Sequence, residues 1–512
     1  MKKLFFLFIV LANTVVGQYN PDAKRDYKWY IGYHFFGDPD SYISSLNFNQ
    51  SPLVIDTVSC GIDFTVTNTG LCDENGQTLF VTNGFRVANR SLELMPNGDS
   101  LSYGLLYNNV VQYMDGNHFY QAAIAFKIPE SFHKYIIIHE KSVDSIYYKN
   151  PMTALQYTTV DMMLENGMGN VTEKNVLLLD DTLDQGAITA VRHGNGRDWW
   201  VLVPKAFYNC YYVFLLTPTG IALKHTQCFS ESRHEMIFCG SSVFSPDGQY
   251  YIRQKEHLTF TPSIIEIYNF DRCLGSLNLL TSFYFDSTGG ALGGVAVSPN
   301  SRYLYVTRLN YLYQFDLHAS DIESSKVLVA SCDSLPDPFA PLVISGLIGL
   351  HLAPDGKIYI VQGASFLGVI HNPDSAGLAC NAEQHALYLP RFDLGYPPTF
   401  PNYRLGRLVG SECDTLVWSG IKEPATEKPA QLLASPNPAS GNMRFELNTS
   451  NFDTEGNLEI YNLTGSKIRS IAVARFQGIV PFDVSNLPDG MYLAVFKQEG
   501  GVLGTVRFVV SR

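Results

Sequence analysis

The 512-residue sequence has little charge and no concentrated basic segment. Only 16% of its residues are charged, its net charge is −12, and lysines and arginines nowhere form a run. Nucleic acids and anionic membranes attract proteins through clustered basic side chains. We therefore expect neither nucleic acid nor an anionic membrane surface as a partner.

Signatures of common catalytic and metal sites are also missing. The sequence contains no G-x-S-x-G, H-E-x-x-H, phosphate-loop or dinucleotide motif. His139-Glu140 and His234-Glu235 lack the second histidine that a zinc helix requires, and no two of the nine cysteines form C-x-x-C. The sequence predicts no catalytic residue, cofactor or metal ligand. Carboxylates from distant segments that meet in space would leave no such signature.

Long apolar runs are absent beyond the first residues. Lys2 and Lys3 precede the apolar segment Leu4 to Leu11, and Val15-Val16-Gly17 offers a small-residue cleavage site, the pattern of a secretory signal. We predict a signal peptide over residues 1–17, with cleavage between Gly17 and Gln18. An uncleaved anchor is the alternative, but the run is too short to cross a bilayer. No transmembrane segment is expected in the mature chain.

What the sequence does contain is a repeat. SPNSRYLYV at 298–306 is matched by SPDGQYYI at 245–252 and APDGKIYIV at 353–361, with weaker copies earlier in the chain. A polar turn followed by alternating aromatic and β-branched residues indicates a tight turn that leads into a strand. The fourth turn residues are Gly76, Phe132, Gly196, Gly248, Ser301 and Gly356. Successive members are 52 to 64 residues apart. A period near fifty residues with several strands per unit is typical of a radial repeat.

The repeats predict an all-β fold that contains a β-propeller over residues 18–420. Each unit holds about four strands, as a propeller blade does. Six units align between residues 60 and 390, and the flanks near Trp29 and at 400–420 hold about one more blade. We expect seven blades, with the first and last strands sharing one blade so that no sheet edge is exposed. Six blades with a decorated flank is the alternative.

The end of the chain has the pattern of a separate unit. Residues 421–434, IKEPATEKPAQLLA, have the composition of a linker. After them, short strand-like segments separated by Gly, Asn or Pro predict a small Ig-like β-sandwich over 435–512.

This last unit resembles the C-terminal sorting domain (type A) of the type IX secretion system of Bacteroidota. The resemblance lies in SPNPASG at 435–441, LEIYNLTGSKI at 458–468 and FDVSNLPDGMYLAVF at 482–496. It implies export to the periplasm by the signal peptide and passage through the outer membrane by the type IX machinery, which would be a partner of this domain. The protein would then be secreted or attached to the cell surface.

The preceding body is similar to WD-repeat-like propellers found beside this sorting domain, a group that implies a fold and no activity. We expect a binding or interaction module, with a surface glycan or a protein as its ligand, because propellers present loops from every blade on one face. The alternatives are a carbohydrate-active enzyme and a structural component of the cell envelope or the gliding apparatus.

Three polar clusters have both a functional interpretation and a simpler one in turn chemistry. One cluster could hold a sugar and contains His193, Asn195, Arg197, Asp198, Trp199 and Trp200. In the simpler interpretation HGNG is a turn, and the two tryptophans lie on opposite faces of the strand that follows it. Asp247, Asn300 and Asp355 could suggest metal sites, but the turn backbone needs them. Residues 451–456 imitate the start of a calcium loop whose twelfth position is Asn462 instead of Glu.

Cys210 and Cys228 form a candidate disulfide. Each lies nine residues from Thr219, so an antiparallel hairpin could place them opposite each other. A shift of one position would move the two side chains to opposite faces, and Cys239 could compete for either thiol. The oxidising route of export would allow the bond to form.

Overall fold

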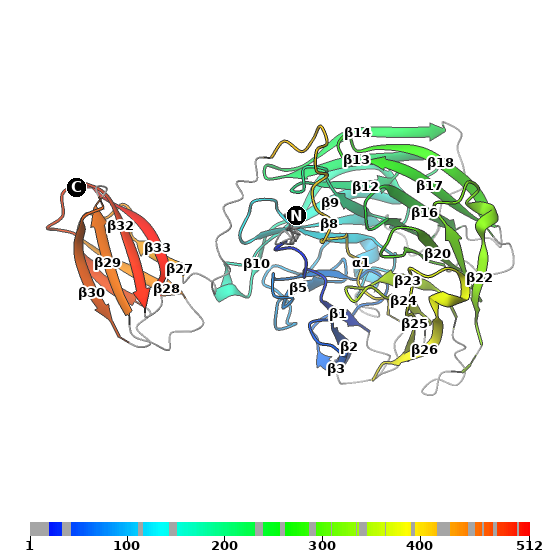
Figure 1. Cartoon of the computed structure of the whole chain (residues 1–512), viewed down its shortest axis with the longest axis horizontal. Helices are drawn as coiled ribbons and strands as arrows, with labels where there is room; N and C mark the ends of the chain where they lie inside the picture. Colours follow the sequence, from blue (N-terminus) through cyan, green and yellow to red (C-terminus); the bar gives the residue numbers. More distant parts are fainter. Residues whose placement is uncertain are drawn as a thin grey trace, which may run out of the picture. The chain divides into compact units, whose positions relative to one another are not determined.

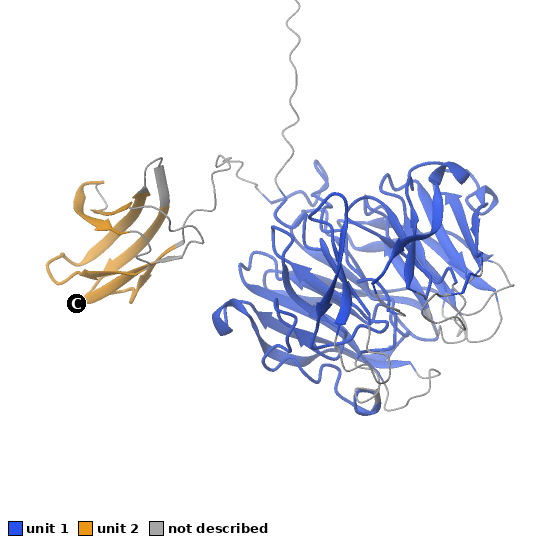
Figure 2. Cartoon of the chain, turned by 90° about the horizontal axis from the view of Figure 1, so that it is seen from below, with its two compact units in different colours: residues 1–416 blue, residues 417–512 orange. Residues whose placement is uncertain are grey.

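The computed structural model of the chain describes residues 20–32, 42–110, 116–142, 151–230, 239–256, 262–285, 293–308, 310–333, 335–336, 346–363, 365–390, 395–416, 431–448, 456–462, 465–474, 479–498 and 501–511. The chain divides into two compact units, residues 1–416 and 417–512 (Figure 2).

The described part of the first unit contains seven antiparallel sheets, each formed by consecutive strands (Figure 1). They consist of β1 Lys28–Ile31, β2 Tyr42–Asn47 and β3 Val54–Ser59; β4 Thr69–Cys72, β5 Thr78–Thr82 and β6 Val87–Ala88; β7 Ala123–Lys127, β8 Lys134–Ser142, β9 Met152–Asp161 and β10 Asn170–Leu183; β11 Thr189–Arg192, β12 Trp199–Pro204, β13 Asn209–Thr217 and β14 Gly220–Ser230; β15 Cys239–Phe244, β16 Tyr250–Glu256, β17 Ser263–Asp271 and β18 Ser276–Phe285; β19 Val295–Val297, β20 Tyr303–Arg308, β21 Tyr311–Asp316 and β22 Val327–Ser331; and β23 Gly349–Leu352, β24 Ile358–Val361, β25 Phe366–Ile370 and β26 Ala382–Tyr388. Short helical segments lie at α1 Leu105–Val110, η1 Glu165–Gly167, η2 Glu323–Ser325 and η3 Gly377–Cys380. The unit is a β-propeller, and the seven sheets are its blades.

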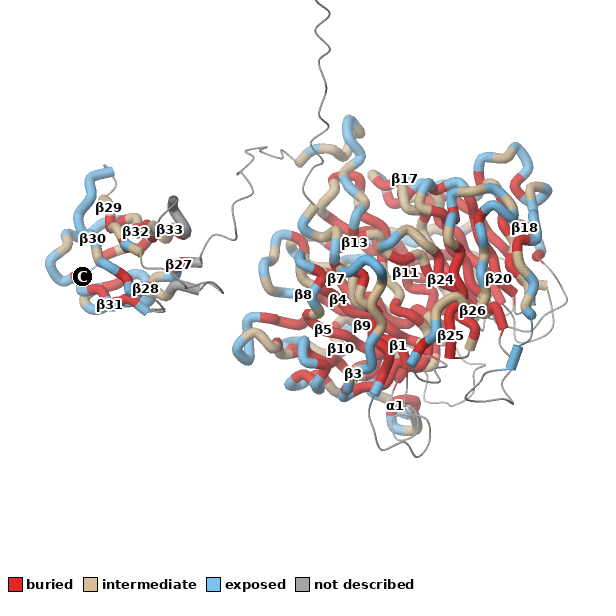
Figure 3. The backbone as a smooth tube through the Cα atoms, turned by 60° about the horizontal axis from the view of Figure 1, so that its bottom comes forward, coloured by how far each residue is buried: buried red, intermediate tan, exposed pale blue. Residues whose placement is uncertain are grey.

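The first strand of a four-stranded blade lies innermost in the ring. Contacts join β4 to β7, β11 to β15, β15 to β19 and β19 to β23, so these strands from successive blades lie side by side. The second strands, such as β12 and β24, are buried along their whole length, as Figure 3 shows for β24. The outermost strand β14 is largely exposed. Strands that touch neighbouring blades on both faces need apolar residues at every position, which explains runs such as IYIV in β24.

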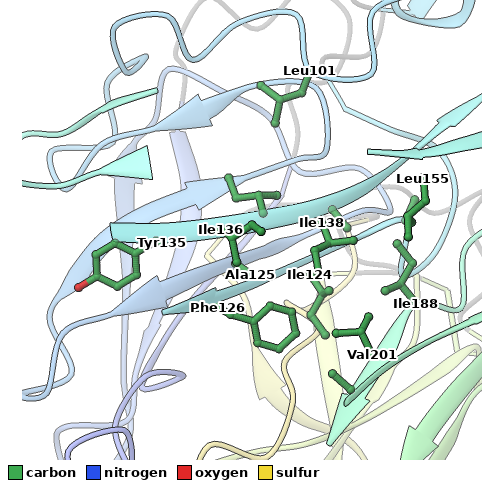
Figure 4. Packing of buried hydrophobic residues seen from close by; sticks show 14 of the residues in the cluster. Leu101, Ile124, Ala125, Phe126, Tyr135, Ile136, Ile138, Leu155, Ile188 and Val201 are labelled. Carbon is green, nitrogen blue, oxygen red and sulfur yellow. The ribbon is translucent and has the colours of Figure 1, made fainter. Parts of the chain in front are cut away.

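The largest apolar cluster joins the second, third and fourth blades. Figure 4 shows Ile124 and Phe126 of β7 and Ile138 of β8 packed near Val201 of β12. All four side chains are fully buried. Each such side chain contributes roughly 1.5–3 kcal/mol relative to its exposed state, so contacts between blades are a main source of the ring's stability.

The ring closes in a different way from the one that the sequence predicts. The first blade contains only β1, β2 and β3, and the described residues 395–416 contribute no strand to it. Pro397, Pro398 and Pro401 explain this difference, because proline has no N–H group to donate to a strand ladder. The prediction that the first and last strands share a blade is therefore wrong for the described residues.

Apolar packing joins the first blade to the last. Trp29, Ile31 and Leu46 of the first blade form one buried cluster with Tyr359 and Leu367 of the last. Trp29 is 4.9 Å from Phe48 and 5.6 Å from Tyr359 between ring centroids, in edge-to-face arrangements that aromatic pairs favour. Side chains therefore close the ring at this seam.

The second unit is a two-layer β-sandwich. Its sheets run in the orders β27-β28-β31 and β30-β29-β32-β33. The strands are β27 Gln431–Ser435, β28 Asn442–Asn448, β29 Gly456–Asn462, β30 Lys467–Val473, β31 Ile479–Asp483, β32 Gly490–Gln498 and β33 Gly501–Val510. Phe445, Phe482 and Phe508 lie in one core cluster between the sheets. β27 begins at Gln431, inside the segment that the sequence assigns to the linker.

Candidate functional site

The repeated turns take the backbone conformation that their residues predict. Gly196, Gly248 and Gly356 have φ of 76°, 74° and 78°, and Ser301 has 60°. This left-handed region disfavours residues with a Cβ atom, which explains glycine at this place in the turn. In the third blade the left-handed residue is Glu130, with φ 62°, and Phe132 lies two residues after it. The repeat there begins two residues earlier than the sequence indicates.

The polar side chains of these turns serve the turns themselves. The Asp247 carboxylate accepts hydrogen bonds from the Ser245 hydroxyl and the Gln249 N–H. Asn300 Oδ1 accepts in the same way from Ser298 and Arg302, and Asp355 accepts from the Lys357 N–H. Among the residues that the structure describes, no group of three or more His, Cys, Asp or Glu side chains has the arrangement of a metal site.

The cluster around His193 is likewise built into the blade. Asp198 accepts from Arg197 Nε at 2.7 Å and from Asn195 Nδ2 at 2.8 Å. Trp199 joins the core cluster shared with the third blade, and Trp200 joins the cluster shared with the fifth, so the two rings do face opposite sides of β12. They are only 3% and 4% exposed, which leaves no aromatic surface on which a sugar could stack.

A cavity of about 610 Å³ lies along the inner strands of the propeller. Its walls include Thr189 of β11, Val243 of β15, Val295 of β19 and Leu352 of β23, and the turns after these strands also contribute. Residues 398–402 and 404–406 form a further wall. This volume falls in the range of small-molecule sites, about 300–1,000 Å³.

Backbone groups contribute to the polarity of this cavity. Each of β11, β15, β19 and β23 is the end strand of its sheet and is hydrogen-bonded to a single neighbouring strand. In an antiparallel pair, alternate N–H and C=O groups point away from the partner. Side chains already bind some of these groups: Gln121 is bonded to the Ser242 N–H and C=O, and the Ser241 hydroxyl accepts the Val295 N–H.

Two residues at the start of the third blade shape the inner part of the cavity. Gln121 donates from Nε2 to the Ser242 carbonyl and accepts the Ser242 N–H, both at 2.8 Å, so it ties this blade to β15. Tyr120 stacks edge-to-face on His351, with ring centroids 5.8 Å apart. Burial raises the pKa of Tyr120 and lowers the pKa of His351 to about 3, so both are neutral at pH 7.

Of the two carboxylates in the described cavity wall, one is paired with a cation and the other is bonded within its own turn. Arg404 Nη1 and Nη2 each donate to Asp26 at 2.7 Å, and Arg404 also donates to the Ala23 carbonyl. With Asp247 held in its turn, the carboxylates that line the described cavity are both occupied. The arrangement is suited to hydrogen bonding with an uncharged ligand.

A network around Asp22 anchors this wall. Asp22 accepts from Arg25 and from Arg192, and Arg192 also donates to the Tyr403 carbonyl. Burial by itself would raise the pKa of Asp22, but the two guanidinium groups hold it below its ordinary value. Asn20 donates to the same Tyr403 carbonyl, so residues 20–26 and 402–404 are bound together.

The described residues of the propeller form two disulfides. Cys210 of β13 is bonded to Cys228 of β14, with their Cα atoms 4.0 Å apart in register. A second disulfide, Cys273–Cys413, attaches residues 407–416 to the turn between β17 and β18. No local pattern in the sequence points to this second pair, because 140 residues separate its members.

Sequence reasoning also missed Tyr120, Gln121, His351 and Arg404, because no local pattern marks a residue that acts through a partner in another blade. His139 and Glu140, at the end of β8, are fully buried and lie outside the cavity lining.

The cleavage residues Gly17 and Gln18, the pair His234-Glu235 and the segment 451–455 lie outside the described residues. In the part of the chain that is described, no helix is long and apolar enough to cross a membrane.

Comparisons with known proteins identify the second unit. Residues 435–511 match the family described as the secretion system C-terminal sorting domain. The chain is therefore a type IX secretion substrate, exported to the medium or the cell surface, and its sorting domain implies the type IX machinery as a partner. A search of curated proteins gives no match.

Solved structures give distant likenesses. A proposed 6-phosphogluconolactonase of Bacteroides uniformis is 13% identical, with a TM-score of 0.44, and the match covers 71% of this chain and 97% of that one. A protein of unknown function from Desulfotomaculum acetoxidans is 14% identical, with a TM-score of 0.40, and the match covers 73% and 99%. The assignment of a propeller rests on the seven sheets themselves.

Proposed function

We propose that this type IX secretion substrate is an extracellular binding protein whose propeller holds an uncharged glycan in its central cavity. The observation that carries the proposal is the cavity of about 610 Å³ between the inner strands. Its size suits a short oligosaccharide, and its described walls combine apolar side chains with backbone hydrogen-bonding groups.

The charge of the walls supports an uncharged ligand. The Arg404 guanidinium is already bound to the Asp26 carboxylate at two points. The Asp247 carboxylate is bound by its own turn. A charged ligand would have to compete with these bonds, whereas the hydroxyl groups of a neutral ligand can bind without breaking an ion pair.

Export fits this role. We propose that the signal peptide, residues 1–17, carries the chain to the periplasm and is cleaved between Gly17 and Gln18, and that the sorting domain then directs it outward. N-terminal sequencing of the exported protein, allowing for cyclisation of the new terminal glutamine, tests the cleavage site. A first residue other than Gln18 would contradict it.

The direct test of the ligand is a glycan array with the purified chain from Gln18 to Arg512. Neutral oligosaccharides are expected to bind, and sulfated or uronic acid-rich ones are expected to bind less tightly. Binding restricted to acidic glycans, or no binding to any glycan, would contradict the proposal.

A further inference from the structure

The four-stranded sheet of the second unit carries apolar side chains on the face turned away from its core. β30, β29, β32 and β33 lie side by side in this sheet (Figure 1). Alternate residues of β32, from Tyr492 to Phe496, enter the core. Met491, Leu493 and Val495 therefore lie on the outer face, where a sandwich sheet normally carries polar residues.

The outer residues of three neighbouring strands form a groove. In the ladder, Leu493 of β32 is the partner of Tyr461 in β29 and of Arg507 in β33, so the three side chains stand in one row. Together with Met491 and other neighbours they line a hollow of about 650 Å³. Met491 is 41% exposed, so part of its apolar surface faces solvent.

The rim of this groove is positively charged. Glu459 is bound by both Lys497, at 2.6 Å, and Lys467, at 3.0 Å, which compensates its negative charge. Arg507 is exposed, and among the described residues it has no carboxylate within salt-bridge distance. One guanidinium group is therefore available to an incoming carboxylate.

We propose that this groove is the surface by which the type IX machinery recognises the sorting domain, and that its occupant is an acidic segment with apolar residues in a machinery protein. Charge complementarity identifies the occupant: carboxylates would pair with Arg507 and with the lysine rim, while apolar side chains would cover Met491 and Leu493. The inference rests on export by the type IX route and is independent of what the propeller binds.

Export of the full chain in a bacterium with a working type IX system tests the proposal. Arg507→Glu reverses the charge at the groove, and Met491→Glu places a carboxylate at its apolar rim. We expect at least a tenfold fall in exported protein for each variant, with the chain retained in the periplasm. Arg507→Lys keeps the charge and should be exported at close to the normal level.

Matched controls lie on the other sheet of the same domain. Arg444 is exposed on β28, where it pairs with Glu446, and Ile479 is 55% exposed on β31, so Arg444→Glu and Ile479→Glu introduce the same side chain away from the groove. Both controls should be exported normally. Export of Arg507→Glu and Met491→Glu at the normal level would overturn the proposal, as would equal losses in the controls.

A photo-crosslinking residue at position 493 identifies the occupant. The expected product is a crosslink to an acidic segment of a machinery component, and reversing the charge of that segment should restore export of Arg507→Glu. A crosslink to a second copy of this chain, or to an uncharged surface, would overturn the assignment.

Discussion

Arg404 and Asp26 are 378 residues apart in the sequence and form an ion pair with two hydrogen bonds of 2.7 Å. Asp26 immediately precedes the first blade, and Arg404 belongs to the segment that follows the last. The pair thus joins the two ends of the ring, which many propellers join through a shared blade. It also fixes residues 398–402 and 404–406 as a wall of the central cavity.

Loss of this pair is expected to lower the free energy of unfolding of the propeller. Arg404→Ala leaves the Asp26 carboxylate, 4% exposed, without its partner. Removing one member of a buried pair costs roughly 3 kcal/mol or more. The fall in the free energy of unfolding can be measured by denaturant titration. Asp26→Ala/Arg404→Ala should cost less than the sum of the two single variants, and strict additivity would contradict the coupling.

The two disulfides should differ in their effect. In the chain-entropy model a crosslink contributes more when it closes a longer loop, about 5 kcal/mol for the separation of 140 residues and about 3 kcal/mol for 18. Cys273→Ser/Cys413→Ser should therefore lower the denaturation midpoint more than Cys210→Ser/Cys228→Ser. The opposite order would contradict the dependence on loop length.

Glu140 should make stability depend on pH. Burial raises its pKa well above 4.5, and nearby Asp184 adds to this, against the hydrogen bond from the Gly186 N–H and the charge of Arg253. A carboxyl with a raised pKa stabilises the fold below its unfolded pKa and loses that contribution as pH rises toward its folded pKa.

The amide in Glu140→Gln imitates the protonated acid. Its stability advantage over the natural chain should grow as pH rises above about 4.5, by at most about 1.4 kcal/mol per pH unit. Thermal melts between pH 4 and 8 measure this difference. Glu323→Gln, at an exposed position, should show no such trend. A constant difference for Glu140→Gln would contradict an uncharged Glu140.

Local patterns predicted the blades because each blade is a local structure. The turn at Ser245–Gly248 and the strand after it lie within a few residues of each other, so the local sequence determines both. Prolines 397, 398 and 401 prevent a closing strand, and their effect on a ladder could have been inferred from the sequence. The choice of Asp26 as the partner of Arg404 could not, because it depends on how seven blades complete a circle.

The cavity was beyond sequence reasoning for the same reason. Thr189, Val243, Val295 and Leu352 lie in separate repeats and become neighbours when the ring forms. Each looks like an ordinary strand residue in its own repeat. The groove of the sorting domain is similar, since Tyr461, Leu493 and Arg507 meet through strand register.

Blocking the cavity tests the central claim most directly. Leu352→Trp adds an indole ring to a wall residue, and Leu328→Trp makes the same change on the outer strand β22, where Leu328 is 46% exposed. Calorimetric titration with a neutral oligosaccharide selected on the array should give at least tenfold weaker binding for Leu352→Trp and unchanged binding for Leu328→Trp. Equal affinity in the natural chain and in a folded Leu352→Trp variant would contradict a ligand site in the central cavity.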